Sequence, residues 1–297
     1  MEKFRKFLLP ILILTLVIGG IFIWREIYVT ENNTNLKVYY LDVGQGDSIF
    51  IEAPNGYQIL IDGGPDKKVL RKLSEVMPFY DRTIDAIIVS HSDKDHIGGL
   101  PFVLKNYKVG KILESGNTST SKVYAELENL INTQKISLFG FKKQKTEKIL
   151  ARTGQKIILD QKNSIHLDIL FPDRDVSDLD SNESSVVAKL IYGNESFLFT
   201  GDSPKITEAY MFNHYKNSLQ ASVLKLAHHG SKTSSSELFL ESVNPQYAVI
   251  SSGKNNSYGH PHKETLDRLQ KRGINYFNTA DVGTIEFETD GEILKIK

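Results

Sequence analysis

The chain has 297 residues, of which 40% are hydrophobic, so it can bury one large core or two small ones. Its 36 basic and 36 acidic residues cancel, which excludes a globally basic nucleic-acid binder and an acidic disordered chain. The absence of cysteine excludes disulfide scaffolds, cysteine nucleophiles, thiolate zinc sites and iron–sulfur clusters. Any metal must therefore be bound by His, Asp, Glu or Asn, and six of the eight histidines form three pairs, at 91/96, 228/229 and 260/262.

The N-terminal segment Phe7–Trp24 is an apolar run of 18 residues, about the minimum length for a helix that spans a bilayer. Three basic residues precede it and predict that the N-terminus stays inside: Lys3, Arg5 and Lys6. No clean cleavage site follows, so residues 1–30 are interpreted as an uncleaved, single-pass signal anchor in the cell membrane, with a cleaved signal peptide as the alternative. Residues 31–35 are then a linker, and residues 36–297 are an extracytoplasmic domain.

That domain is mildly acidic. The first 30 residues hold four of the 36 basic residues and two of the 36 acidic ones, so the remainder has a formal charge of about −2. A nucleic acid would therefore need a local basic surface, and the best candidate is the segment Phe141–Lys148 together with Arg152. A solvated run of charges is the alternative interpretation of this segment.

The elements predicted beyond residue 36 alternate between strands and helices. Strands are predicted at 36–43, 47–53, 58–61, 85–90, 155–160, 165–171, 185–192, 196–200, 221–227, 247–252, 284–288 and 293–296. Helices are predicted at 67–76, 121–134, 203–215, 234–243 and 262–272. Gly193 and Asn194 are typical of a two-residue hairpin, and the strand at 85–90 is apolar on both faces and therefore central in a sheet. Hairpins joined to strand–helix alternation predict a mixed, layered α/β fold.

The strongest motif, residues 90–99, directly follows this central strand. It holds four potential metal ligands within six residues: His91, Asp93, Asp95 and His96. Loops at strand ends are where sites are built, and one loop can direct all four side chains at one centre. A solvated turn is the alternative, but a turn does not require two histidines and two aspartates between an apolar strand and a Gly-Gly pair. The motif therefore predicts a metal site.

Four weaker motifs also follow predicted strands or turns. Asp202 is either the cap of the next helix or a carboxylate whose two oxygens bridge two cations. At a strand-to-turn junction one of His228 and His229 can bind a metal while the other faces the substrate, although one buried and one exposed structural histidine would give the same pattern. His260 lies over the site or in an exposed turn, and Asp62 orients a metal-binding histidine or belongs to a turn.

In this order the motifs resemble those of the metallo-β-lactamase superfamily, and more narrowly the metallo-hydrolase domain of the ComEC/Rec2 competence proteins. Five further stretches carry the narrower resemblance: Leu41–Ser48, Ile61–Gly64, Leu198–Asp202, Ala227–Ser231 and Gly259–His262. The resemblance spans Leu36 to the C-terminus. It implies a four-layer αββα sandwich with a two-metal hydrolase site at one edge.

Two residues depart from the usual superfamily pattern, as they do in the competence proteins. Asp93 and Asn182 stand where histidines are usual, and this exchange of nitrogen for oxygen favours manganese or a mixed site over zinc. Both also argue against β-lactam hydrolysis. Competence proteins carry a many-helix membrane channel, whereas this chain has one candidate helix, so DNA transport does not follow. A separate channel protein is left open as a partner.

The resemblance implies two divalent metal ions, manganese or zinc. We expect two overlapping ligand sets: His91, Asp93 and the bridging Asp202 for one ion, and Asp95, His96, Asp202 and His229 for the other. Two cations that share a water lower its pKa, and Asp95 is expected to orient the resulting hydroxide. His228 and His260 are candidates to hold or protonate a phosphate oxygen, with Asp62 and Asn182 beside the ligands rather than among them.

These expectations predict a hydrolase that uses this hydroxide to cleave phosphodiester bonds outside the membrane, in the first place those of a DNA strand. One alternative is a cell-envelope phosphodiesterase that acts on a phosphocholine or teichoic-acid linkage. The other is a DNA-capture module with little catalysis.

Overall fold

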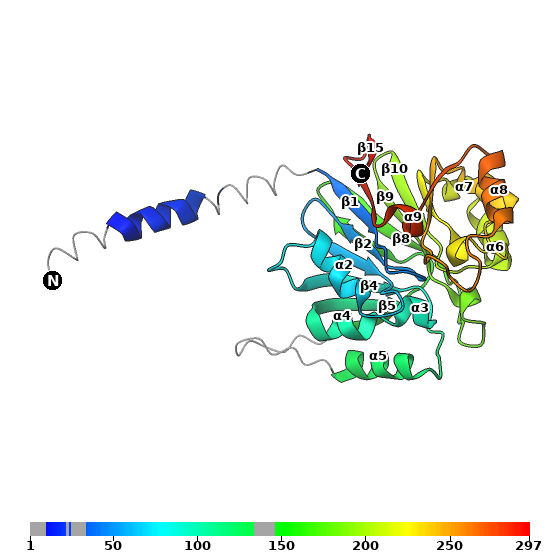
Figure 1. Cartoon of the computed structure of the whole chain (residues 1–297), viewed down its shortest axis with the longest axis horizontal. Helices are drawn as coiled ribbons and strands as arrows, with labels where there is room; N and C mark the ends of the chain where they lie inside the picture. The colour runs from blue at the N-terminus through cyan, green and yellow to red at the C-terminus, as the bar shows by residue number, and fades with distance from the viewer. Residues whose placement is uncertain (1–9, 22–23, 25–33, 134–145) are drawn as a thin grey trace.

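The computed structural model describes residues 10–21, 24, 34–133 and 146–297 (Figure 1). Among these residues the strands form two sheets, one in the order β15-β14-β1-β2-β3-β4-β5-β6 and one in the order β13-β12-β11-β10-β9-β8-β7. The first sheet contains β1 (Leu36–Tyr40), β2 (Ile49–Glu52), β3 (Gln58–Ile61), β4 (Thr83–Val89), β5 (Lys108–Glu114), β6 (Glu147–Leu150), β14 (Ile285–Thr289) and β15 (Leu294–Ile296). The second contains β7 (Lys156–Asp160), β8 (Ile165–Phe171), β9 (Val187–Tyr192), β10 (Glu195–Phe199), β11 (Val223–Lys225), β12 (Tyr247–Ile250) and β13 (Asn275–Asn278).

Helices cover the outer face of each sheet (Figure 1). The first sheet carries α2 (Lys68–Val76), α3 (Lys94–Ile97), α4 (Leu100–Asn106) and α5 (Lys122–Thr133). The second carries α6 (Lys205–Tyr215), α7 (Glu237–Val243) and α8 (Lys263–Lys271), and the short α9 (Thr279–Val282) follows β13. The expected four-layer αββα sandwich is therefore confirmed.

The layers follow from the two-residue period of the strands. In β1, Val38 and Tyr40 point into the core between the sheets, where Phe197 of β10 also lies, whereas Tyr39 points to the helices. A second core lies between the first sheet and its helices, and a third between the second sheet and α6, α7 and α8. Strand β4 lies between β3 and β5 and is buried on both faces, as its apolar sequence predicted.

Parallel pairing determines where the site lies. Strands β3, β4 and β5 are parallel to one another, and so are β10, β11, β12 and β13. The carboxyl ends of neighbouring parallel strands lie at one edge of a sheet, which is where ligands bind in open α/β folds. The loops that follow β3, β4, β10, β11 and β12 carry all five predicted motifs.

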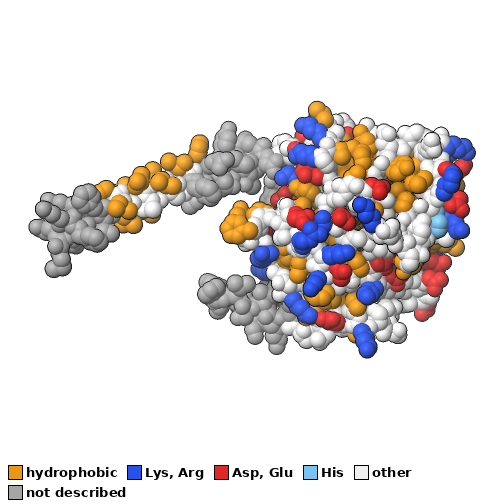
Figure 2. Space-filling model, in the orientation of Figure 1, with side chains coloured by type: hydrophobic (Ala, Val, Ile, Leu, Met, Phe, Trp, Pro, Cys, Tyr) orange, Lys and Arg blue, Asp and Glu red, His pale blue; other side chains and the backbone are white. Residues whose placement is uncertain are grey.

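The apolar N-terminal segment is helical over Pro10–Ile21 and at Trp24, whereas residues 1–9, 22–23 and 25–30 of the predicted anchor and 31–33 of the predicted linker lie outside the described residues. Its leucine, isoleucine and valine side chains are 51% to 67% exposed and form an apolar segment beside the domain (Figure 2). Within the part of the chain that the structure describes, no helix has both the length and the apolar character needed to cross a bilayer.

Candidate metal centre

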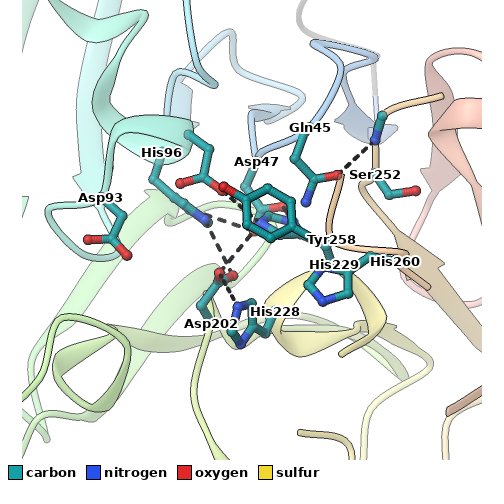
Figure 3. Close-up of polar contacts among 12 residues, drawn as sticks. Gln45, Asp47, Asp93, His96, Asp202, His228, His229, Ser252, Tyr258 and His260 are labelled. Atoms are coloured by element: carbon teal, nitrogen blue, oxygen red, sulfur yellow. Dashed lines mark hydrogen bonds and ion pairs between the residues drawn. The ribbon is translucent and has the colours of Figure 1, made fainter. Parts of the chain in front are cut away.

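Side chains from both sheets converge at this edge (Figure 3). Asp47 from the β1–β2 loop, His96 from α3, Asp202 after β10 and His229 after β11 each offer a ligand atom within 4.8 Å of the others. All four residues are buried. Two acids and two imidazoles in such a small buried space are a ligand set typical of a divalent cation.

Asp202 lies between the two histidines. Its Oδ1 is 3.3 Å from His96 Nε2, and its Oδ2 is 3.4 Å from His229 Nε2. His229 Nε2 is also 3.2 Å from Asp95 Oδ2. The alternative interpretation of Asp202 as a helix cap is wrong, because α6 has Pro204 at its N-cap and no side chain caps it.

His91 and Asp93 lie on the outer side of this group. The His91 ring is 4.0 Å from the His96 ring, and His91 Nε2 is 3.6 Å from Asp93 Oδ2. The Asp93 side chain is 48% exposed and stands apart from the other carboxylates in Figure 3. Asn182 begins a short 3₁₀ turn (Asn182–Ser184) next to Ser181, whose hydroxyl is 3.3 Å from that of Ser92. The two residues that depart from the superfamily pattern thus belong to neighbouring loops.

Asp62 lies behind the first pair of histidines. Its Oδ2 accepts a hydrogen bond from His96 Nδ1 at 2.8 Å and another from the Ser90 hydroxyl at 2.6 Å. The same hydroxyl is 2.9 Å from His91 Nδ1. A carboxylate on Nδ1 fixes the tautomer of an imidazole and leaves Nε2 facing a metal position. This is the geometry that a metal-orienting carboxylate requires.

Asp47 occupies the equivalent position behind His229 and is a site residue that the motifs did not predict. Its Oδ1 is 3.4 Å from His229 Nδ1, on the side of the ring away from Asp202, while Lys225 Nζ forms an ion pair with its Oδ2. We therefore interpret Asp47 as a carboxylate that orients His229, although its oxygens also fall within the cluster of ligand atoms. Lys225 was missed too, and its signal was a lysine within the otherwise apolar strand that precedes His228.

Gly46 lets the loop that carries Asp47 approach α3. Its φ is +131°, and a Cβ at this position would lie 2.1 Å from the carbonyl oxygen of Asp95. The Asp47 amide donates to that same carbonyl at 3.3 Å. A larger residue would push apart the loop and the helix that supply Asp47, Asp95 and His96, because backbone cannot yield as a side chain end can.

A tight left-handed turn separates the roles of the two neighbouring histidines. His228 and His229 have φ values of 52° and 53°, a region that costs energy for residues with a Cβ. This backbone turns the buried His229 into the cluster and leaves His228, with a 28% exposed side chain, at the rim. The rings of His228 and His260 are 5.4 Å apart there, so both predicted phosphate-binding histidines lie at the mouth of the site.

The carboxylates give the centre a strong attraction for cations. Burial opposes ionisation of Asp202, but His229 and His96 hold its pKa well below the usual range. Burial also disfavours charged histidine, yet Asp202 and Asp47 raise the pKa of His229 to about 9, and Asp202 and Asp62 raise the pKa of His96 well above its usual value. At pH 7 without metal, His96 and His229 are therefore protonated. A metal ion would replace these protons, since a metal binds neutral imidazole.

The histidines at the rim have lowered pKa values, in contrast to His96 and His229 in the centre. Burial, followed by the neighbouring imidazoles His228 and His229, lowers the pKa of His260 to about 4. Burial likewise lowers the pKa of His228. Both rings are therefore neutral at pH 7, and each carries one N–H that can donate to a substrate oxygen.

Three atoms test whether the residues fit a metal ion. His91 Nε2, His96 Nε2 and Asp202 Oδ1 are buried, and within the described residues none makes a hydrogen bond, since His96 Nε2 and Asp202 Oδ1 meet only as an ion pair at 3.3 Å. A buried polar atom without a partner costs about 1–3 kcal/mol, and three in one cluster need an explanation. A cation would supply the missing partner to all three, because imidazole nitrogen and carboxylate oxygen are both metal ligands. His91, His96 and Asp202 therefore fit a bound metal ion.

Comparison with known proteins agrees with this geometry. The family model described as the metallo-beta-lactamase superfamily matches residues 41–254. The chain is 32% identical over 269 residues to ComE operon protein 3 of Bacillus subtilis (strain 168), covering 84% of this chain and 33% of that protein. It is 29% identical over 279 residues to competence protein ComA of Neisseria gonorrhoeae, covering 92% of this chain and 35% of that protein. The chain thus spans about a third of the length of these curated relatives.

Two solved structures share the fold. CmlA, a diiron β-hydroxylase from Streptomyces venezuelae, has a TM-score of 0.51 at 13% identity, covering 81% of this chain and 52% of its own. Igni18, a metallo hydrolase from the archaeon Ignicoccus hospitalis, has a TM-score of 0.50 at 16% identity, covering 86% and 99%. At these identities the likeness concerns the fold alone. The matched family model, the fold and the relatives together establish that the chain belongs to the metallo-beta-lactamase superfamily, with relatives that include ComEC/Rec2-like competence proteins.

Proposed function

We propose that the chain is a metal-dependent hydrolase that cleaves phosphodiester bonds of a DNA strand outside the cytoplasmic membrane. One observation carries the hydrolase part: Asp202 faces His96 and His229 with its two oxygens in a buried cluster that contains unpartnered ligand atoms. The DNA part is supported by the competence proteins among its relatives and by two exposed lysines, Lys205 and Lys232, that line a hollow beside the cluster.

Two overlapping ligand sets would hold the metal ions: His91, Asp93 and Asp202 for one, and Asp95, His96, Asp202 and His229 for the other. When bound, a pair of divalent cations would lower the pKa of a shared water and offset the negative charge of a phosphodiester. The chain's own groups do the rest. Asp62 and Asp47 hold the histidine rings in place, and the N–H groups of His228 and His260 hold a phosphate oxygen at the rim.

A hollow of about 720 Å³ adjoins the rim, and it is lined by Lys205, Lys232 and Arg268 together with Glu237 and Glu264. Lys205 and Lys232 are both exposed and form no ion pair with any described residue. The hollow connects to the site through Thr233, whose Oγ1 is 3.4 Å from His228 Nδ1. A nucleic acid needs positive charge close to the site. The face in Figure 2 carries interspersed basic and acidic side chains and supplies no continuous basic surface.

The basic segment that the sequence suggested is a poorer surface for a nucleic acid. Residues 141–145 lie outside the described residues. Lys148 pairs with Glu114 at 2.7 Å and with Glu128 at 2.8 Å. Arg152 donates to two backbone carbonyls, so its guanidinium is already engaged within the fold. The interpretation as an ordinary run of charges fits these contacts better.

Activity of the full chain in detergent tests the proposal. The protein is stripped with a chelator, reloaded with Mn²⁺ or Zn²⁺, and assayed on single- and double-stranded DNA, a bis-aryl phosphodiester, a phosphocholine ester and a chromogenic cephalosporin. Metal-restored cleavage of DNA supports the proposal. Turnover of the phosphocholine ester without DNA cleavage would favour the envelope phosphodiesterase instead. DNA binding without cleavage would favour the capture module, and no turnover of any phosphodiester would exclude both enzymes.

We also propose that Phe7–Trp24 anchors the domain to the outer face of the membrane. The helix over Pro10–Ile21 exposes apolar side chains all round, as a segment surrounded by lipid does. Protease digestion of a C-terminal tag on intact cells tests this topology. Digestion is expected, and complete protection would contradict the external placement.

A further inference from the structure

The loop between β12 and α8 is braced by one side chain. The Asn256 amide nitrogen donates to the carbonyl oxygens of Gly253, at 3.0 Å, and His260, at 2.6 Å. Its amide oxygen accepts from the backbone N–H groups of Tyr258, at 3.2 Å, and His260, at 3.0 Å. The Asn256 side chain thus makes four hydrogen bonds to the backbone of this loop, which favour the loop conformation that positions Tyr258 and His260.

This loop places an exposed aromatic ring at the mouth of the site. Tyr258 is 64% exposed, and its ring stacks on that of His260 with centroids 5.7 Å apart and planes inclined by 22°. In Figure 3 the Tyr258 ring lies in front of the cluster formed by Asp47, His96 and His229. Exposed aromatic residues are common, but this one combines a braced loop with a stacked partner, His260, whose ring is 6.2 Å from that of His229.

We propose that Tyr258 is a stacking platform for a nucleobase next to the bond that is cleaved, and that the substrate is therefore a single strand. This inference rests on the proposed nuclease function and adds the substrate class. A ring with one face packed and the rest exposed can receive a base, and every base has a π-face, so stacking requires no particular sequence. In a duplex the base faces are already stacked on each other, so only an unpaired base can use the platform.

The surroundings favour a base over the quaternary ammonium of phosphocholine. Recognition of such a cation normally uses a cage of several aromatic rings, whereas Tyr258 is a single tyrosine beside histidines. The hollow lined by Lys205 and Lys232 also begins nearby, because the Lys232 backbone amide donates to His262, whose ring is 4.8 Å from that of His260. The three basic residues that line this hollow outnumber Glu237 and Glu264, so its net charge favours the phosphates of a strand over a choline group.

Oligonucleotide binding tests the platform in the full chain carrying Asp202→Asn, with chelator present so that the strand is not cleaved during the measurement. Adding Tyr258→Leu is expected to weaken binding of a short single strand about 5- to 100-fold, the usual effect of losing one base–aromatic stack. Adding Tyr258→Phe, which keeps the ring, is expected to leave the dissociation constant within about twofold. Tyr80→Leu is the matched control, since Tyr80 is 72% exposed and precedes the amino end of β4, at the edge opposite the site.

A strand with one abasic nucleotide, moved along its length, locates the contact. One abasic position is expected to weaken binding by the Asp202→Asn chain and to have no further effect once Tyr258 is leucine. The platform is refuted if Tyr258→Leu binds as tightly as its parent, if Tyr258→Phe is as weak as Tyr258→Leu, or if the abasic effect persists in Tyr258→Leu. These results would leave the nuclease proposal standing. Failure of the wild-type chain to bind or cleave any oligonucleotide would instead refute both the stacking platform and the nuclease proposal.

Discussion

Replacing Lys225 by methionine is expected to destabilise the domain by about 3 kcal/mol. The Lys225 and Asp47 side chains are 1% and 2% exposed, so the change leaves a buried carboxylate without its main counter-charge. Removing one partner of a buried ion pair typically costs about 3–5 kcal/mol. His229 and His96 lie 3.4 and 3.9 Å from the Asp47 carboxylate and offset part of this cost. The expected loss is therefore at the lower end of the range of about 3–5 kcal/mol.

Denaturant unfolding of the metal-free chain measures this cost, because bound metal would add its own stabilisation. The double variant Lys225→Met with Asp47→Asn is expected to lose less than Lys225→Met alone, since no unpaired charge then remains buried. Lys37→Met is the control, because Lys37 forms a partly exposed pair with Glu52 at 3.6 Å and such pairs contribute only about 0–1 kcal/mol. A loss below about 1 kcal/mol for Lys225→Met, or a double variant that loses the sum of both changes, would refute the reasoning.

Four further predictions concern the metal centre. Asp95→Asn and Asp202→Asn are each expected to lower phosphodiester turnover at least about 10²-fold while the circular dichroism spectrum stays unchanged; near wild-type rates would remove the assigned roles. Asp62→Ala is expected to weaken metal binding about 10- to 100-fold by calorimetry, because the His96 ring loses the carboxylate partner of Nδ1 and keeps only the Ser90 hydroxyl at 3.3 Å; unchanged affinity would argue against an orienting role. Gly46→Ala is expected to weaken metal binding at least about 10-fold, because its Cβ would meet the Asp95 carbonyl at 2.1 Å, and a tightly binding variant would show that the loop yields without cost. Since His229 has a pKa raised to about 9 without metal, metal must displace its proton, so affinity should rise between pH 7 and 9 with proton release in calorimetry; a pH-independent affinity would contradict this.

Much of the fold could be predicted from local patterns. The hairpin of β9 and β10 is confirmed around Gly193 and Asn194, and the central position of β4 is confirmed from its unbroken apolar run. Strand β5 was missed because Lys108 and Lys111 interrupt its apolar pattern. Helices α3 and α4 were missed because the first is a single turn inside the metal motif and the second follows two glycines and has Pro101 in its first turn.

The site was predictable only in part, because its residues meet across two sheets. His96, Asp202 and His229 each follow an apolar strand, so their position at a strand end could be predicted. Asp47 lies in a glycine-rich loop that resembles an ordinary turn, and its partner Lys225 comes from the other sheet. No periodicity within one segment records such a long-range pairing. The left-handed turn at His228 and His229 is likewise a consequence of tertiary packing.

The most direct test of a two-metal phosphodiesterase at this edge is the rate of single-strand cleavage during metal titration. The chelator-stripped chain is titrated with Mn²⁺ or Zn²⁺, in parallel with its Asp202→Asn variant. The wild-type rate is expected to rise from background and saturate, and the variant is expected to stay at least about 10²-fold lower at every metal concentration. A wild-type rate that is the same with and without metal, or a full rate in Asp202→Asn, would contradict the assignment of this cluster as the catalytic centre.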